Sequence, residues 1–179
     1  MFILRQRLAQ LSHEAQPRVM SASCRAGSFY VTTEKDAFAL NLGLMPNNPQ
    51  AGIDAAIEVM EKARRYGFTE AELEHAKVQH TVNIEHRLDN KNKTRNAEYA
   101  KNIVSNFCGD EPCMNIEYEA ALEAEFSATV TLDDINNAIK EIVDDQNQVC
   151  IVFGPTQYDG KPYTMPSADQ FKKWIENAQ

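Results

Sequence analysis

The chain has 179 residues, of which 43% are hydrophobic and 25% charged, values typical of one globular domain that is long enough to bury a core. Its formal net charge of -8 at pH 7 argues against a nucleic-acid surface, because phosphate binding requires clustered lysines and arginines, and the basic runs here are short and flanked by acids. No apolar run approaches the roughly 20 residues that span a bilayer, so we expect no membrane span.

The first predicted elements are a helix and a hairpin. Residues 2–11 place apolar side chains at positions 3, 4, 8 and 11, which is a helical spacing. Residues 18–31 and 36–44 are rich in β-forming residues, and we expect them to pair as an antiparallel hairpin with a turn around Thr33 to Lys35. The second strand alternates apolar residues on one side: Phe38, Leu40, Leu42 and Leu44.

The middle of the chain is predicted to be helical. Apolar residues recur at helical spacing from Ile53 to Ala63, and this helix should end before Gly67. Residues 93–107 and 115–128 are polar-rich helices, and a short last helix should begin between Ser167 and Gln170. Two further helices open with a capping box, in which an acid returns a bond three residues after a threonine cap: Thr69 with Glu72, and Thr131 with Asp134. Each cap is flanked by a possible hydrophobic staple: Phe68 with Leu73, and Val130 with Ile135.

The run QVCIVFGP at 148–155 is too short and too β-branched for a helix and stops at Gly154-Pro155, so we predict a buried strand. The fold class is therefore α+β, with helices laid over an antiparallel sheet of at least three strands. So small a sheet leaves edges of unpaired backbone groups, which tend to find a partner. We expect either the remainder of a longer polypeptide or a second copy to complete it.

Residues 72–86, ELEHAKVQHTVNIEH, contain three of the four histidines and raise the question of a metal site. Zinc peptidases bind the metal through two helical histidines beside a glutamate, in the order H-E-x-x-H or H-x-x-E-H. Neither order occurs. An H-x-x-E-H motif ending at His86 would need a histidine at position 82, which is Val82. An H-E-x-x-H motif starting at His13 would need one at position 17, which is Pro17. His75 and His86 would lie roughly 16 Å apart on one helix, too far for one ion. We predict no metal ligand.

The remaining histidine and the cysteines favour packing roles. His80 shares an apolar stripe with Leu73 and Ile84, and a lone histidine there is usually a hydrogen-bonded packing residue. The four cysteines are scattered and form no C-x-x-C pair: Cys24, Cys108, Cys113 and Cys150. Three of them lie in apolar or element-end contexts, which suits buried free thiols. Cys108 and Cys113 are close enough in sequence to pair in an oxidising compartment, an alternative that the sequence leaves open.

The stretch RYGFTEAELEHAKV at 65–78 resembles the insulinase-like, or pitrilysin (inverzincin), family of zinc metallopeptidases. In that family a helix break followed by G-F-[ST]-x-x-E-[LF] opens a long helix in each repeated domain. Further stretches follow in the family's order and extend the resemblance over nearly the whole chain: 3–11, 107–119, 130–139, and 149–155 followed by MPSADQF.

The resemblance implies a fold and a place in the peptidase. The fold is a two-layer α/β sandwich of the mitochondrial-processing-peptidase-like metallohydrolase kind, an antiparallel sheet covered by helices, of which residues 1–179 form one unit. The family's zinc is held by H-x-x-E-H plus a downstream glutamate in the first domain, so zinc is expected only in the parent protein's catalytic domain. Some members donate an arginine and a tyrosine seven residues apart to the substrate, but Arg5 is followed by Ser12 and Arg7 by Glu14. The chain therefore resembles the later part of a non-catalytic domain.

The function implied is part of the wall of a chamber that encloses a peptide, with other domains or subunits of the peptidase and the peptide substrate as partners. An edge of the hairpin could add the peptide as another strand. The alternative is a separate scaffold subunit that assembles with a zinc-binding catalytic subunit. An independent hydrolase is disfavoured, because the sequence has no G-x-S-x-G, no P-loop and no paired carboxylates at a suitable spacing. We predict no catalytic, cofactor-binding or metal residue and no activity of the chain alone, and we favour the periplasm or cell envelope over the cytoplasm for the parent protein.

Overall fold

The computed structural model describes residues 1–28, 35–109, 112–143 and 147–178. Its helices are α1 (Phe2–Gln10), α2 (Pro49–Tyr66), α3 (Glu70–Asp89), α4 (Asn96–Gly109), α5 (Ile116–Thr129), α6 (Leu132–Ile142) and α7 (Ala168–Ala178), with a short 3-10 helix η1 (Lys91–Lys93). Its strands are β1 (Val19–Ser28), β2 (Asp36–Leu44), β3 (Gln157–Tyr158) and β4 (Lys161–Pro162). The fold is mostly helical α+β with small antiparallel sheets, as the sequence predicts at this level.

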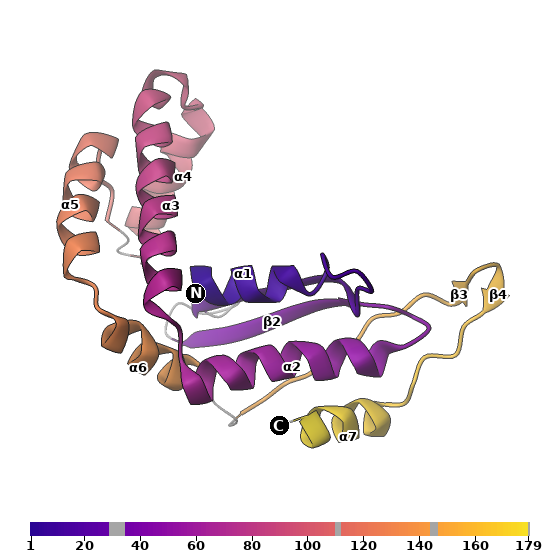
Figure 1. Cartoon of the computed structure of the whole chain (residues 1–179). Coiled ribbons are helices and arrows are strands. Elements are labelled where there is room, and N and C mark those ends of the chain that lie inside the picture. Colours follow the sequence, from indigo (N-terminus) through magenta and orange to yellow (C-terminus); the bar gives the residue numbers. More distant parts are fainter. Residues whose placement is uncertain (29–34, 110–111, 144–146, 179) are drawn as a thin grey trace.

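The body of the molecule is built from α1, the β1–β2 hairpin and α2 (Figure 1). The apolar stripe of α1 is buried, with Leu4 and Leu8 fully enclosed. It meets Val19 and Cys24 of β1, the small residues of α2 and the end of α6 in one core, whose buried members are Ile3, Leu4, Leu8, Leu11, Val19, Ala22, Cys24, Ala55, Ala56, Ala63, Phe68, Ile139 and Val143. The four alternating apolar residues of β2 pack against this core, as expected.

The predicted hairpin is confirmed by an antiparallel register that runs from Val19 opposite Leu44 to Ser28 opposite Asp36. One irregularity interrupts it between Val19 and Ser21. The predicted turn falls largely on residues 29–34, which lie outside the described part of the chain.

The predicted helix ends are also confirmed. Thr69 and Thr131 cap α3 and α6, and in each case the acid three residues later closes a capping box. Helix α7 opens with a reciprocal pair of bonds, since Ser167 N donates to Gln170 Oε1 at 2.9 Å and Gln170 N donates to Ser167 Oγ at 3.3 Å. Local hydrogen bonding therefore specifies these boundaries before any tertiary contact is made.

Helices α3, α4 and α5 form an arm that stands away from the body (Figure 1). Helix α3 starts at the body and carries the arm outward, and α5 lies beside it. Neither α4 nor α5 has a buried residue. Several large apolar side chains are exposed on α4: Tyr99, Ile103, Val104 and Phe107. The arm is thus far less tightly packed than the body.

Helix α7 packs below α2 and makes a second, smaller core (Figure 1). Ile53 and Ile57 of α2 contact Phe171, and Val152 and Trp174 pack at the edge of this cluster. Phe171 and Trp174 lie edge to face, with ring centroids 5.2 Å apart. In the described residues no helix is both long and apolar enough to cross a bilayer.

The predicted third strand is wrong. Residues 148–155 belong to no strand, and each of the two sheets in the described part of the chain has two strands. The second sheet is the short β3–β4 hairpin, which turns through Asp159 and Gly160, both at positive φ. Asp-Gly is a strong hairpin signal, and the sequence analysis did not use it. The 148–155 segment has strand-forming residues, but the described part of the chain provides no edge that it pairs with.

The expectation of buried cysteines holds only for Cys24. Cys108, Cys113 and Cys150 are exposed, and all four thiols are free. Cys108 ends α4 on the loosely packed arm, so the apolar residues around it in sequence do not enclose it.

Substituting Leu8→Ala should lower the free energy of unfolding by about 2–5 kcal/mol, because it leaves a cavity in the centre of the body. Phe107→Ala, a larger truncation at an exposed site on α4, should change it by less than about 0.5 kcal/mol. Urea unfolding followed by circular dichroism measures both. Equal effects of the two substitutions would contradict the separation into packed body and loose arm.

Candidate functional site

The most highly connected polar group of the molecule lies where α2 ends and α3 begins. The chain breaks at Gly67 and Phe68, and Thr69 caps the new helix. Arg7, from the last turn of α1, reaches this break from the other side of the body. Two segments far apart in sequence, the end of α1 and the junction between α2 and α3, therefore meet around one guanidinium group.

Arg7 binds Glu72 through two parallel hydrogen bonds. Its Nε lies 2.6 Å from Glu72 Oε1, and its Nη2 lies 2.7 Å from Oε2. Nη2 also donates to the Gly67 carbonyl oxygen at 3.2 Å, and Cζ lies 4.9 Å from the centroid of the Phe68 ring. Such a forked pair fixes both distance and orientation, so it sets the direction in which α3 leaves the body.

Glu72 has no remaining capacity for catalysis. Besides Arg7, it accepts hydrogen bonds from Thr69 N at 2.8 Å and Thr69 Oγ1 at 2.9 Å. The hydrogen bonds from Arg7 lower its pKa to about 2; partial burial opposes this shift, and the bonds from Thr69 add to it. A carboxylate so stabilised in its ionised form is a poor proton acceptor at neutral pH.

Asn136 of α6 completes the junction. Its Oδ1 accepts a hydrogen bond from Phe68 N at 2.7 Å, and its Nδ2 lies 3.5 Å from Phe68 O. Gly67 has φ 72°, and a Cβ atom at this position would lie 2.5 Å from Asn136 Oδ1. The glycine is therefore required both by the backbone conformation and by the close approach of α6.

The two arginines that the resemblance brought into question are both bound within the chain. Arg5 Nε donates to the Cys24 carbonyl oxygen of β1 at 2.7 Å, while Arg7 binds Glu72. Glu14, seven residues after Arg7, pairs with Arg18 at 3.0 Å. Arg5 and Arg7 thus join α1 to β1 and to the start of α3, whereas the Glu14–Arg18 pair is local and exposed.

A shallow hollow of about 380 Å³ lies between α1, α2 and the start of α3. It is lined by three acids, and each has a cation beside it: Glu14 pairs with Arg18, Glu58 with Lys62 at 2.6 Å, and Glu72 with Arg7. Each acid in the hollow is therefore held in an ion pair within the chain.

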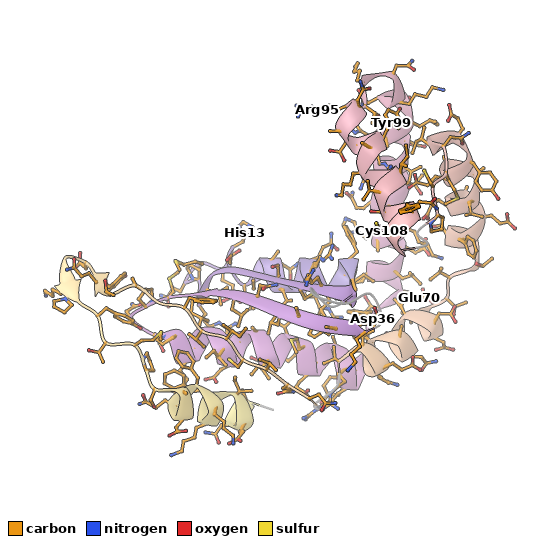
Figure 2. All side chains as sticks on the ribbon, turned by 180° about the vertical axis from the view of Figure 1, so that it is seen from behind. His13, Asp36, Glu70, Arg95, Tyr99 and Cys108 are labelled. Atoms are coloured by element: carbon orange, nitrogen blue, oxygen red, sulfur yellow. The ribbon has the colours of Figure 1, made fainter. Side chains whose placement is uncertain are left out.

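The histidines do not converge. In the part of the chain that the structure describes, no group of three or more His, Cys, Asp or Glu side chains could hold a metal ion. His13 lies over the body, whereas Cys108 lies on the arm (Figure 2). His80 is hydrogen-bonded, as expected, with its Nε2 2.8 Å from Glu123 Oε2, but its side chain is 51% exposed and it is not a packing residue. Its neighbours on the stripe, Leu73 and Ile84, are buried.

The contact between α3 and α5 is a ladder of ion pairs. His80 faces Glu123, Arg87 binds both carboxylate oxygens of Glu119, and Lys91 Nζ lies 2.6 Å from Glu117 Oε1. These three basic side chains follow one another along α3 and η1, and Ile84 of α3 is buried. Since α5 buries no residue, this polar seam is its main attachment to α3.

The sequence analysis missed the long-range partners at both places. Glu72 was identified as a capping residue, but Arg7 lies 65 residues away and Asn136 lies 68 residues beyond Phe68. The only sequence signal for the seam was the run of acids at 117, 119 and 123 opposite basic positions on α3, and one sequence gives no means of aligning the two helices.

No protein-family model matches the sequence, and no curated protein matches it. Solved structures are similar to it. A predicted insulinase family protease from Yersinia pestis matches 99% of this chain and 37% of its own, with a TM-score of 0.78 and 14% identity. The first half of the periplasmic protease PqqL from Escherichia coli matches 79% of this chain and 30% of its own, with a TM-score of 0.66 and 15% identity.

The chain is similar in fold to part of an insulinase family protease. The resemblance first seen at residues 65–78 is thereby confirmed at the level of the fold. The full PqqL structure gives the same result, with a TM-score of 0.68 and 14% identity over 79% of this chain and 16% of its own. The chain spans between 16% and 37% of the lengths of these proteins.

Substituting Glu72→Gln should reduce stability at pH 7 by about 1–3 kcal/mol, the range for hydrogen bonds to charged groups. Folding lowers the pKa of Glu72 from 4.5 to about 2, so its contribution is complete above pH 4.5 and is lost as the pH falls towards 2. The stability of the variant should therefore fall less steeply than that of the wild type over this window, in urea titrations from pH 7 to 3. Glu70→Gln, in the same helical turn, is the control. Parallel curves for Glu72→Gln and wild type would refute the assignment.

Raising the salt concentration should weaken the attachment of α5 before it affects the body. The reason is that the Debye length, over which charges interact, falls from about 10 Å at 0.1 M salt to about 3 Å at 1 M. Hydrogen exchange followed by mass spectrometry should show faster exchange in α5 and little change in α2. Arg87→Gln at low salt should reproduce the effect of salt, whereas Lys101→Gln on α4 should not. Exchange in α5 that is insensitive to salt and to Arg87→Gln would mean that apolar contacts hold it.

Proposed function

We propose that this chain is the later part of a non-catalytic domain of a zinc metalloendopeptidase. In this proposal residues 1–179 form one unit of a two-layer α/β sandwich, with α1 and α2 covering an antiparallel sheet of which β1 and β2 are a part. The observation that carries it is that 99% of the chain matches only 37% of an insulinase family protease, while its sequence lacks H-x-x-E-H.

The role proposed is enclosure of the substrate rather than bond cleavage. A wall domain keeps water and folded proteins out of the chamber in which another domain, carrying the zinc, cuts the peptide. The internal pairing of Arg7 with Glu72 supports this role, since both hydrogen bonds of the forked pair hold that guanidinium within the chain. The partners are then the other domains of the peptidase and the peptide itself.

The β1–β2 hairpin supports a contact with the peptide. Each strand pairs on one side only in the described residues, so each has an edge of unpaired N–H and C=O groups. An extended peptide binds such an edge through main-chain hydrogen bonds, with little dependence on its sequence. This suits an enzyme that encloses varied peptides.

The size of the protein in its native cells tests the proposal. An antibody against residues 1–179 should detect a polypeptide much larger than 20.2 kDa, and that polypeptide should contain zinc. A band at 20.2 kDa that co-purifies with a zinc-binding protein would instead support the separate scaffold subunit. A band at 20.2 kDa with no such partner would refute both.

The purified 179-residue chain should neither retain zinc nor hydrolyse peptides. After incubation with zinc and gel filtration, metal analysis should find far less than one zinc per chain, because the described residues offer no cluster of ligands. A quenched fluorescent peptide library should show no turnover above buffer. Turnover abolished by a chelator, or stoichiometric zinc lost on substitution of His75, His80 or His86, would overturn the proposal.

A further inference from the structure

Residues 148–155 have the composition of a β-strand but pair with no other strand in the described part of the chain. The segment crosses the body to β3 without joining a sheet (Figure 1). In the described residues no backbone hydrogen bond links residues 148–155 to any other part of the chain. Both of its edges are therefore open, a condition that folded proteins rarely leave uncorrected for apolar sequences.

Val152 alone of residues 149–153 packs against the body. It lies at the edge of the cluster formed by α2 and α7. The large apolar side chains at the alternate positions are strongly exposed, Val149 by 84%, Ile151 by 71% and Phe153 by 91%, and Cys150 is exposed as well. Large apolar residues at every second position are the pattern of a strand whose second face is buried in a sheet.

We propose that residues 149–153 form an edge at which the sheet is continued by an extended, apolar β-strand from polypeptide outside residues 1–179. The strand would hydrogen-bond to the open backbone and cover Val149, Ile151 and Phe153. This inference rests on the proposed function, because it takes this chain to be one part of a larger peptidase. It adds the place at which the two parts join.

Two observations favour an occupant from outside the chain over a second copy. The similar portion makes up only 37% of the Yersinia protein, so there it is accompanied by much further polypeptide. The net charge of -8 also opposes the close approach of two identical chains. Residues 147–158, in contrast, contain no charged side chain, so this stretch presents no repulsion to an incoming strand.

Site-specific photocrosslinking in the protein as made in its native cells tests the proposal. With p-benzoylphenylalanine at position 151, irradiation should join this site to a segment outside residues 1–179, and mass spectrometry should identify that segment as apolar and alternating. A crosslink to residues 149–153 of another copy would overturn the proposal in favour of self-association. Recovery of only uncrosslinked protein would overturn it by showing that the site faces water.

A matched pair of substitutions distinguishes loss of the proposed strand pairing from loss of the fold of the chain. Ile151 and Ile103 are similarly exposed, by 71% and 61%, so Ile151→Lys and Ile103→Lys should both leave the Tm of the 179-residue chain unchanged. In the native protein Ile151→Lys alone should speed proteolytic cleavage within 147–158 by about tenfold or more, because unpaired segments are where proteases cut. Equal cleavage of the two variants would refute the proposal.

The two failures can be told apart. If the native protein proves to be 20.2 kDa, the larger peptidase is wrong, but a crosslink from position 151 to a separate polypeptide would still establish the strand pairing. If the native protein is larger and position 151 finds no strand, the proposed function stands and the joining edge is wrong.

Discussion

The forked ion pair between Arg7 and Glu72 is the interaction on which the arrangement of this molecule depends. It ties the last turn of α1 to the first turn of α3 across the break at Gly67 and Phe68, and the same carboxylate closes the capping box with Thr69. Because α3 carries the whole arm, the angle set at this junction decides where α4 and α5 lie (Figure 1). Asn136 adds α6 to the junction, so four helices are oriented by one small set of satisfied polar groups. Satisfied groups are rigid and chemically quiet, which suits a structural role better than a catalytic one.

The body and the arm are stabilised by different interactions. The body is held mainly by buried aliphatic packing around Leu4 and Leu8, in which no charged group of the described residues takes part. The arm is held by exposed ion pairs along α3 and α5, each of which contributes little and is weakened by salt. For the wall domain proposed above, this division means that the arm could move without unfolding the body. The apolar side chains exposed on α4 form a surface of the kind that binds a partner.

The 148–155 segment shows what a strand requires beyond its own sequence. A strand needs a neighbouring edge for its hydrogen bonds and a covering layer for its apolar face. Residues 148–155 have part of the covering layer, through Val152, but no paired edge in the described chain. The solved structures similar to this chain are longer proteases, of which it matches 30% and 37%, and the proposed strand pairing rests on that difference in length.

The sequence by itself determined most of the local structure and showed that the H-x-x-E-H motif does not occur. Helix stripes, both capping boxes, the β1–β2 hairpin and the missing H-x-x-E-H could be read directly, because each depends on residues within a few positions of one another. Only the tertiary structure decided that Arg7 meets Glu72, that His80 and three of the cysteines are exposed, and that Val149, Ile151 and Phe153 lie outside any sheet. Strand propensity at 148–155 was visible, but pairing was not, because propensity is a property of the segment whereas a ladder of hydrogen bonds also requires a neighbour at the right distance. Burial follows the same rule: an apolar residue is enclosed only where other elements arrive to enclose it.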